Sequence, residues 1–115
     1  MRYLVVVAHP DDEILGVKRL VLKAEDIIDQ FECEYHRFIQ GACFNDGKIY
    51  SLEGFGHDKI NLPAIRVINP ETKTQEIFEV FENFESPTEP ELIDFWDGVC
   101  YYADNPGNIY VLTEL

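Results

Sequence analysis

The chain has 115 residues and a formal net charge of -13, from 22 acidic residues against 9 Lys and Arg. This length suits one domain, and a hydrophobic content of 46% supplies a packed core, which excludes a disordered chain. The charge argues against nucleic acid and an anionic membrane surface as partners. No apolar run approaches the roughly 18 residues of a membrane-spanning helix, and no signal peptide is evident, so we expect a cytoplasmic protein.

The first predicted element is a strand at residues 3–8, YLVVVA, which is continuously apolar as in a strand buried on both faces. The sequence HPDDE follows at once, and Pro10 ends the strand. Residues 1–16 are therefore treated as a segment distinct from the region 17–115.

Short strand-like runs and turn signals alternate through the rest of the chain. The predicted strands are residues 17–23, 31–35, 38–44, 48–53, 64–68, 75–81, 92–95, 99–103 and 108–113. Asp46-Gly47 and Asp97-Gly98 each stand between two such runs, and this dipeptide favours a type I′ hairpin turn. Residues 24–30 are the one stretch that could hold a helical turn.

The two hairpins reveal an internal repeat with an offset of 51 residues, because FNDGKIY at 44–50 matches FWDGVCY at 95–101. Downstream, residues 64–68 align with 108–112 at an offset of 44. A period near 50 residues with four short strands per copy is typical of a propeller blade. The predicted fold is mostly β: about two four-stranded propeller-like blades, with copies at about 31–81 and 82–115, plus the extra N-terminal strand.

From about residue 20 to 115 the chain resembles the C-terminal blades of bacterial six-bladed β-propellers of the glutaminyl-cyclase-like or signalling-like type. The stretches that carry the resemblance are DQFECEYHRFIQGACFNDGKIYSLEGFG, AIRVINPETKTQEI and EPELIDFWDGVCYYADNPGNIYVL. Such a resemblance implies a fold more than an activity. The favoured function is a non-catalytic binding or structural module.

The segment VVVAHPDDEILG resembles the opening motif of the LmbE/PIG-L family of zinc-dependent N-deacetylases, which act on N-acetylglucosamine-type substrates. The resemblance implies that His9 and Asp12 are zinc ligands and that Asp11 is the general base. Zinc would lower the pKa of its bound water, and the carboxylate would take the proton. A zinc-dependent deacetylase fragment is therefore the alternative function.

A third zinc ligand decides between these functions, because catalytic zinc has three protein ligands and an open position. The other histidines, His36 and His57, lie outside any segment like the family's third-ligand motif. We expect His36 to be a surface residue and His57 to be a loop residue. No strand–helix alternation follows that could build the family's α/β sheet. No cofactor is expected, and zinc would be present only if the chain is a deacetylase. The join between the two resemblances is compatible with natural recombination, an engineered chimera or a truncated product.

Other polar and aromatic residues have a structural interpretation first. Four tyrosines at strand spacing are predicted to form core between blades: Tyr50, Tyr101, Tyr102 and Tyr110. Glu85, Glu89 and Glu91 are predicted to form a solvated acidic loop near a blade axis, where Gln40-Gly41 is the match one copy earlier. A ring of such carboxylates binding calcium is the alternative. Cys33, Cys43 and Cys100 are expected to be reduced thiols.

We also expect the chain to form a homo-oligomer. Two blades cannot close a ring, and repeat architectures need about three or more units for stability. The second copy ends after its third strand, which leaves an edge that residues 3–8 could fill, from the same chain or a neighbour. A trimer would supply six blades, and a dimer that buries the blade faces is the alternative.

Overall fold

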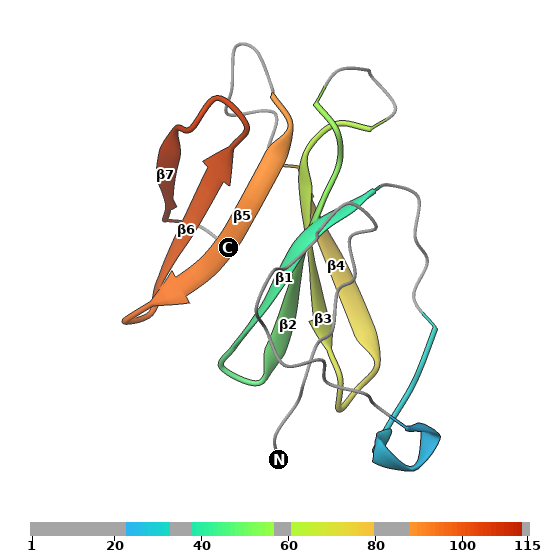
Figure 1. Cartoon of the computed structure of the whole chain (residues 1–115). Coiled ribbons are helices and arrows are strands. Elements are labelled where there is room, and N and C mark those ends of the chain that lie inside the picture. Colours follow the sequence, from blue (N-terminus) through green and yellow to red (C-terminus); the bar gives the residue numbers. More distant parts are fainter. Residues whose placement is uncertain (1–22, 33–37, 57–60, 80–87, 114–115) are drawn as a thin grey trace.

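A computed structural model describes residues 23–32, 38–56, 61–79 and 88–113, and these are mostly β. The described residues form two antiparallel sheets (Figure 1). None of their helices is long and apolar enough to cross a membrane. The predicted strand at 3–8 lies outside the described residues, as does the predicted strand at 17–23 apart from its last residue.

Each sheet is a meander in which consecutive strands are neighbours. The four-stranded sheet contains β1 (Ile39–Asn45), β2 (Lys48–Glu53), β3 (Ala64–Asn69) and β4 (Thr74–Glu79). The three-stranded sheet contains β5 (Pro90–Trp96), β6 (Val99–Asp104) and β7 (Ile109–Leu112). The four-stranded sheet lies within the predicted first copy, and the described residues of the predicted second copy provide three strands.

Both predicted hairpins are confirmed. Asp46 and Gly47 have φ values of 47° and 76°, and Asp97 and Gly98 have 49° and 76°. Two successive residues with positive φ define the type I′ turn, whose twist matches that of the flanking strands. The strand pairing is also irregular at the same place in each sheet, between Ile39 and Gly41 in β1 and between Pro90 and Leu92 in β5, again 51 residues apart.

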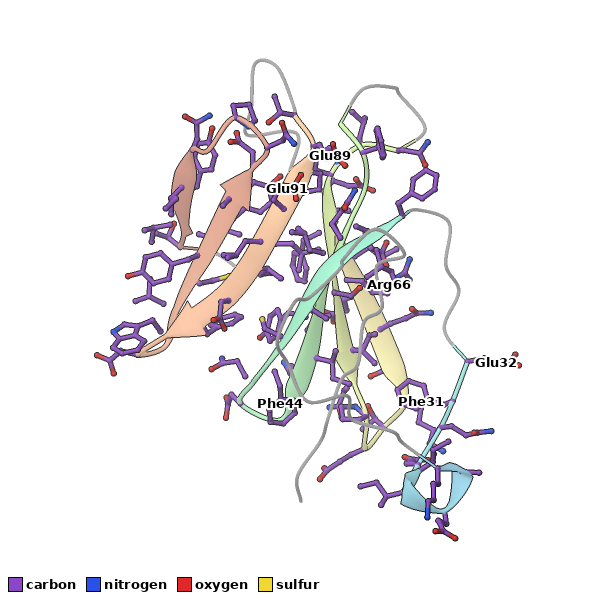
Figure 2. The ribbon with its side chains drawn as sticks, in the orientation of Figure 1. Phe31, Glu32, Phe44, Arg66, Glu89 and Glu91 are labelled. Atoms are coloured by element: carbon purple, nitrogen blue, oxygen red, sulfur yellow. The ribbon has the colours of Figure 1, made fainter. Side chains whose placement is uncertain are left out.

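Two predictions near the N-terminus had different outcomes. Residues 24–30 do contain a helical turn, the 3₁₀ turn η1 (Ala24–Asp26). The predicted strand at 31–35 is wrong at its start, because Phe31 and Glu32 lie outside any strand, and its remaining residues are outside the described ranges. Phe31 and Glu32 are drawn on the extended segment that follows η1 (Figure 2).

The core lies between the two sheets, where β5 contacts β1 and β2 (Figure 1). The Tyr50 and Phe95 rings meet across this seam with their centroids 4.6 Å apart. The four-stranded sheet contributes Cys43, Tyr50, Leu52, Ile65, Val67 and Phe78, and the three-stranded sheet contributes Ile93, Phe95, Cys100, Tyr102, Tyr110 and Leu112. Tyr50, Tyr102 and Tyr110 are thus core residues, as predicted.

The two sheets meet through unlike faces. We call the core-facing side of each sheet its inner face and the other side its outer face. The inner residue Tyr50 has its counterpart, 51 residues later, in Tyr101, whereas the inner face of the three-stranded sheet is formed by the neighbours Cys100 and Tyr102. Successive residues of a strand point to opposite faces, so Tyr101 lies on the outer face, and the prediction that it is a core residue is wrong in the described structure.

Candidate functional site

The predicted zinc site lies outside the described residues. His9, Asp11 and Asp12 fall in the range 1–22, and His36 and His57 are likewise outside the described ranges. In the part of the chain that the structure does describe, no group of three or more His, Cys, Asp and Glu residues could hold a metal ion. The zinc site therefore stays a prediction from the sequence.

The two described glutamates of the predicted acidic loop differ. Glu91 is exposed and lies in β5, whereas Glu89 is half-buried, and each accepts a side-chain hydrogen bond. The Gln40 amide donates hydrogen bonds to the Glu89 carboxylate at 3.1 Å and to the Gly54 carbonyl at 3.0 Å. The Glu91 carboxylate accepts a hydrogen bond of 3.1 Å from the Asn105 amide. Glu89 and Glu91 lie at the start of β5, beside the four-stranded sheet (Figure 2). Gln40, which the sequence analysis aligned with this region, is thus in direct contact with Glu89. Glu85 lies outside the described residues.

Asp104, at the end of β6, is a buried carboxylate with several hydrogen-bond donors. It accepts hydrogen bonds from the Asn108 backbone N–H at 2.8 Å and side chain at 3.1 Å, from the Thr88 hydroxyl at 3.0 Å and from the Tyr110 hydroxyl at 3.1 Å. Burial raises the pKa of this carboxyl, but the hydrogen bonds to Asn108, Thr88 and Tyr110 outweigh burial and hold it below its ordinary value. Asp104 therefore fixes the loop between β6 and β7.

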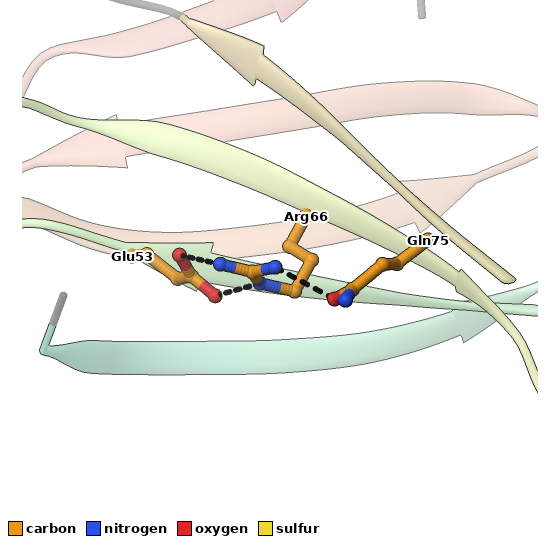
Figure 3. Close-up of polar contacts among 3 residues, drawn as sticks. All are labelled: Glu53, Arg66 and Gln75. Atoms are coloured by element: carbon orange, nitrogen blue, oxygen red, sulfur yellow. Dashed lines mark hydrogen bonds and ion pairs between the residues drawn. The ribbon is translucent and has the colours of Figure 1, made fainter. Parts of the chain in front are cut away.

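Glu53, at the end of β2, forms a buried ion pair with Arg66 of β3 (Figure 3). The Arg66 Nε lies 2.6 Å from Glu53 Oε1 and its Nη2 lies 3.3 Å from Oε2. Arg66 Nη1 also donates to Gln75 Oε1 of β4 at 2.6 Å. The fork geometry satisfies both carboxylate oxygens and ties three strands together.

Glu53 and Asp104 hold matching positions in the two sheets, and the sequence interpretation did not single them out. They are 51 residues apart, each ends the second strand of its sheet, and each contacts a third-strand residue, Arg66 or Tyr110. The signal was present, because KIYSLE and VCYYAD both end with an acid at the same place in the predicted repeat. Within the described residues no buried side-chain nitrogen or oxygen lacks a partner, so both carboxylates have structural roles.

An open depression of about 250 Å³ lies on the four-stranded sheet, lined by Lys48, Val67, Asn69, Thr74, Gln75 and Glu76. It is slightly smaller than the roughly 300–1,000 Å³ of small-molecule sites and has a largely polar lining. We find no convergent arrangement of reactive groups among its residues.

The outer face of the three-stranded sheet is the apolar surface that stands out. Large hydrophobic side chains come from all three of its strands and are solvent-exposed: Leu92, Trp96, Val99, Ile109 and Val111. A contiguous exposed apolar face of this kind marks an interaction site more often than a catalytic one.

Comparison with known proteins gives no relative from which to transfer a role. No protein family, curated protein or solved structure matches this chain.

Proposed function

We propose that the chain is a non-catalytic β-propeller-like module of two blades that serves binding or structure. The observation that carries the proposal is the stacking of its two sheets through unlike faces, with a 51-residue offset between equivalent positions. In a propeller each blade presents one face to the blade before it and the other face to the blade after it. The hairpins, the pairing irregularities and the buried carboxylates that recur at this offset also support two copies of one unit.

The distribution of polar groups supports a module without chemistry of its own. The buried carboxylates Glu53 and Asp104 are occupied by hydrogen bonds within the chain. The thiols Cys43 and Cys100 have pKa values raised by burial and, to a lesser extent, by the charge on Asp94, to about 12 and about 11, so neither is a thiolate nucleophile at neutral pH. The exposed apolar face of the three-stranded sheet is the remaining feature that fits a binding function.

A zinc-dependent deacetylase is the second candidate, and the AHPDDE sequence after a predicted buried strand favours it. Elemental analysis of the purified protein, together with an assay for amide hydrolysis of an N-acetylglucosamine substrate, separates the two functions. The module predicts no stoichiometric zinc and no hydrolysis. One zinc per chain, lost in His9→Ala, would overturn the module in favour of the deacetylase.

A further inference from the structure

The outer face of the three-stranded sheet holds one carboxylate among apolar side chains. Leu92, Asp94 and Trp96 follow one another on this face of β5, because alternate residues of a strand point to the same side. Tyr101 of β6 is paired directly with Asp94, and Val111 of β7 continues the row. Trp96 is 76% exposed and Val111 is 54% exposed, so the surroundings of this carboxylate are accessible.

Among the described residues, no Lys or Arg forms an ion pair with Asp94. Its Oδ1 accepts a hydrogen bond of 2.8 Å from the backbone N–H of Phe95, and the side chain is exposed. Covering a carboxylate with apolar groups costs free energy unless the cover also supplies a cation or hydrogen-bond donors. A partner that covers this face must therefore bring a positive charge to Asp94.

The charged residues of this part of the chain are all acidic. Residues 74–115 contain ten Asp and Glu and no Lys, Arg or His, and β5, β6 and β7 all lie within this stretch. The same face of a second copy would bring another carboxylate instead of a cation, and each copy has a net charge of -13. Charge complementarity therefore favours a cationic partner over a second copy.

The matching row inside the chain shows what kind of cover such a face takes. Cys43 and Tyr50 form the corresponding pair of the four-stranded sheet, 51 residues earlier. The Phe95 ring packs on Tyr50 there, with the two centroids 4.6 Å apart. That cover is apolar and faces a neutral thiol. On the outer face a carboxylate stands in place of the thiol, so the cover needs apolar groups together with a cation.

We propose that the outer face of the three-stranded sheet binds an amphipathic segment of a partner protein that presents arginine among apolar side chains. The guanidinium pairs with Asp94 in the bidentate geometry that carboxylates favour, and the apolar side chains cover Leu92 and Val111. Trp96 lies two residues along β5, about 7 Å from Asp94 at roughly 3.3 Å per residue, so its ring is within reach of the same cation. This inference rests on the proposed binding module and names the class of its partner.

The test titrates the purified protein with a short peptide of alternating Leu and Arg, acetylated and amidated at its ends. Trp96 is the only tryptophan in the sequence, so its fluorescence reports docking on this face without an added dye. A peptide of alternating Leu and Glu reverses the charge, and a peptide of alternating Ser and Arg removes the apolar contact. At about 0.15 M salt, charges more than about 8 Å apart are largely screened, which suppresses attraction by net charge alone.

Two variants of the face have matched controls. Asp94→Asn removes the charge from the face, and Glu71→Gln removes an exposed charge from the turn between β3 and β4. Ile109→Ser removes an apolar contact from the face, and Ile28→Ser is its control, because both isoleucines are 72% exposed and Ile28 lies in neither sheet. Circular dichroism and cooperative unfolding check that each variant is folded.

The Leu–Arg peptide is expected to bind wild type, Glu71→Gln and Ile28→Ser with dissociation constants within about twofold of one another. Asp94→Asn and Ile109→Ser are expected to weaken its binding at least about tenfold. The two comparison peptides are expected to bind wild type at least about tenfold more weakly. Equal binding of the Leu–Glu peptide, unchanged affinity in folded Asp94→Asn, or no binding of the Leu–Arg peptide to wild type would overturn the proposal.

Light scattering at micromolar concentration tests the other occupant, a second copy. A wild-type oligomer that the folded Ile109→Ser variant no longer forms would show that copies cover this face, and would overturn the proposal. Failure of the proposed module is distinguishable from these results. A zinc-free protein that did not bind the peptide would remain a non-catalytic module without this partner. Stoichiometric zinc held by His9 would overturn the module whatever the peptide titration gave.

Discussion

At the scale of single residues, the fold depends on two buried carboxylates whose partners lie on the adjacent strand or loop. The side chains of Glu53 and Arg66 are 1% and 4% exposed, so the free energy of either charge depends strongly on the other. Removing one member of such a pair leaves a charge buried without compensation, while replacing both with apolar residues is often tolerated. We therefore expect a single substitution to destabilise the fold strongly and a double apolar substitution to change its stability much less.

We predict that Glu53→Ala lowers the free energy of unfolding by about 3–5 kcal/mol, because it leaves the Arg66 guanidinium buried without its carboxylate. The double variant Glu53→Leu with Arg66→Met is expected to recover most of this loss. Urea unfolding measures both, and the exposed Glu71→Ala serves as a control expected within about 0.5 kcal/mol of wild type. A double variant less stable than Glu53→Ala would contradict this account.

Asp104 makes stability depend on pH in the acidic range. Although burial raises its pKa, hydrogen bonds from Asn108, Thr88 and Tyr110 lower the folded-state value below the ordinary 3.8. The unfolded chain therefore binds a proton at higher pH than the folded chain. The stabilisation by ionised Asp104 is complete above about pH 4 and is lost as the pH falls through the folded pKa.

The comparison of wild type with Asp104→Asn isolates this contribution from those of the other carboxylates. The variant is expected to be less stable at pH 7, because an amide cannot accept every hydrogen bond that Asp104 accepts. The stability difference is expected to shrink below about pH 4. Thermal unfolding between pH 7 and pH 2.5 measures it, and a difference that stayed constant with pH would refute the assignment.

At the scale of elements, the turns were the most predictable feature, and the glycines explain why. Asp-Gly between apolar runs specifies a type I′ turn locally, so both hairpins could be read from four residues. The glycines of the loop after β2 differ, because their constraint comes from distant backbone. An added Cβ at Gly56 would lie 2.3 Å from the Thr88 carbonyl carbon, a contact that sequence periodicity does not reveal.

We expect Gly47→Ala to cost about 1–2 kcal/mol, which is the penalty of the left-handed conformation for a residue with a Cβ. No heavy atom outside the neighbouring residues lies within 4 Å of that added Cβ. Gly56→Ala should cost clearly more, because it adds a backbone clash to a φ of 79°. Urea unfolding of the two variants compares them directly, and equal losses would mean that the loop moves away at no cost.

At the scale of the whole molecule, the sequence predicted the strands of each sheet better than it predicted how the two sheets pack against each other. Alternation and turn residues indicated the strands from 38 to 113 within a few residues, because those signals are local. The seam between unlike faces depends on how two sheets pack, and the buried carboxylates depend on a partner strand. The predicted strand at 31–35 is wrong at Phe31 and Glu32, which pair with no neighbouring strand of the two described sheets.

The seam between the sheets also contains a chemical reporter of its own opening. Cys43 and Cys100 both lie in the core there, and Cys100 is only 3% exposed. Their protonated, shielded thiols react slowly with electrophiles at neutral pH, since the thiolate is the reactive form. In a Cys33→Ser background, the rate of alkylation at the buried Cys100 therefore follows how often the sheets separate. Opening of the seam can then be timed with the native thiols as the reacting groups.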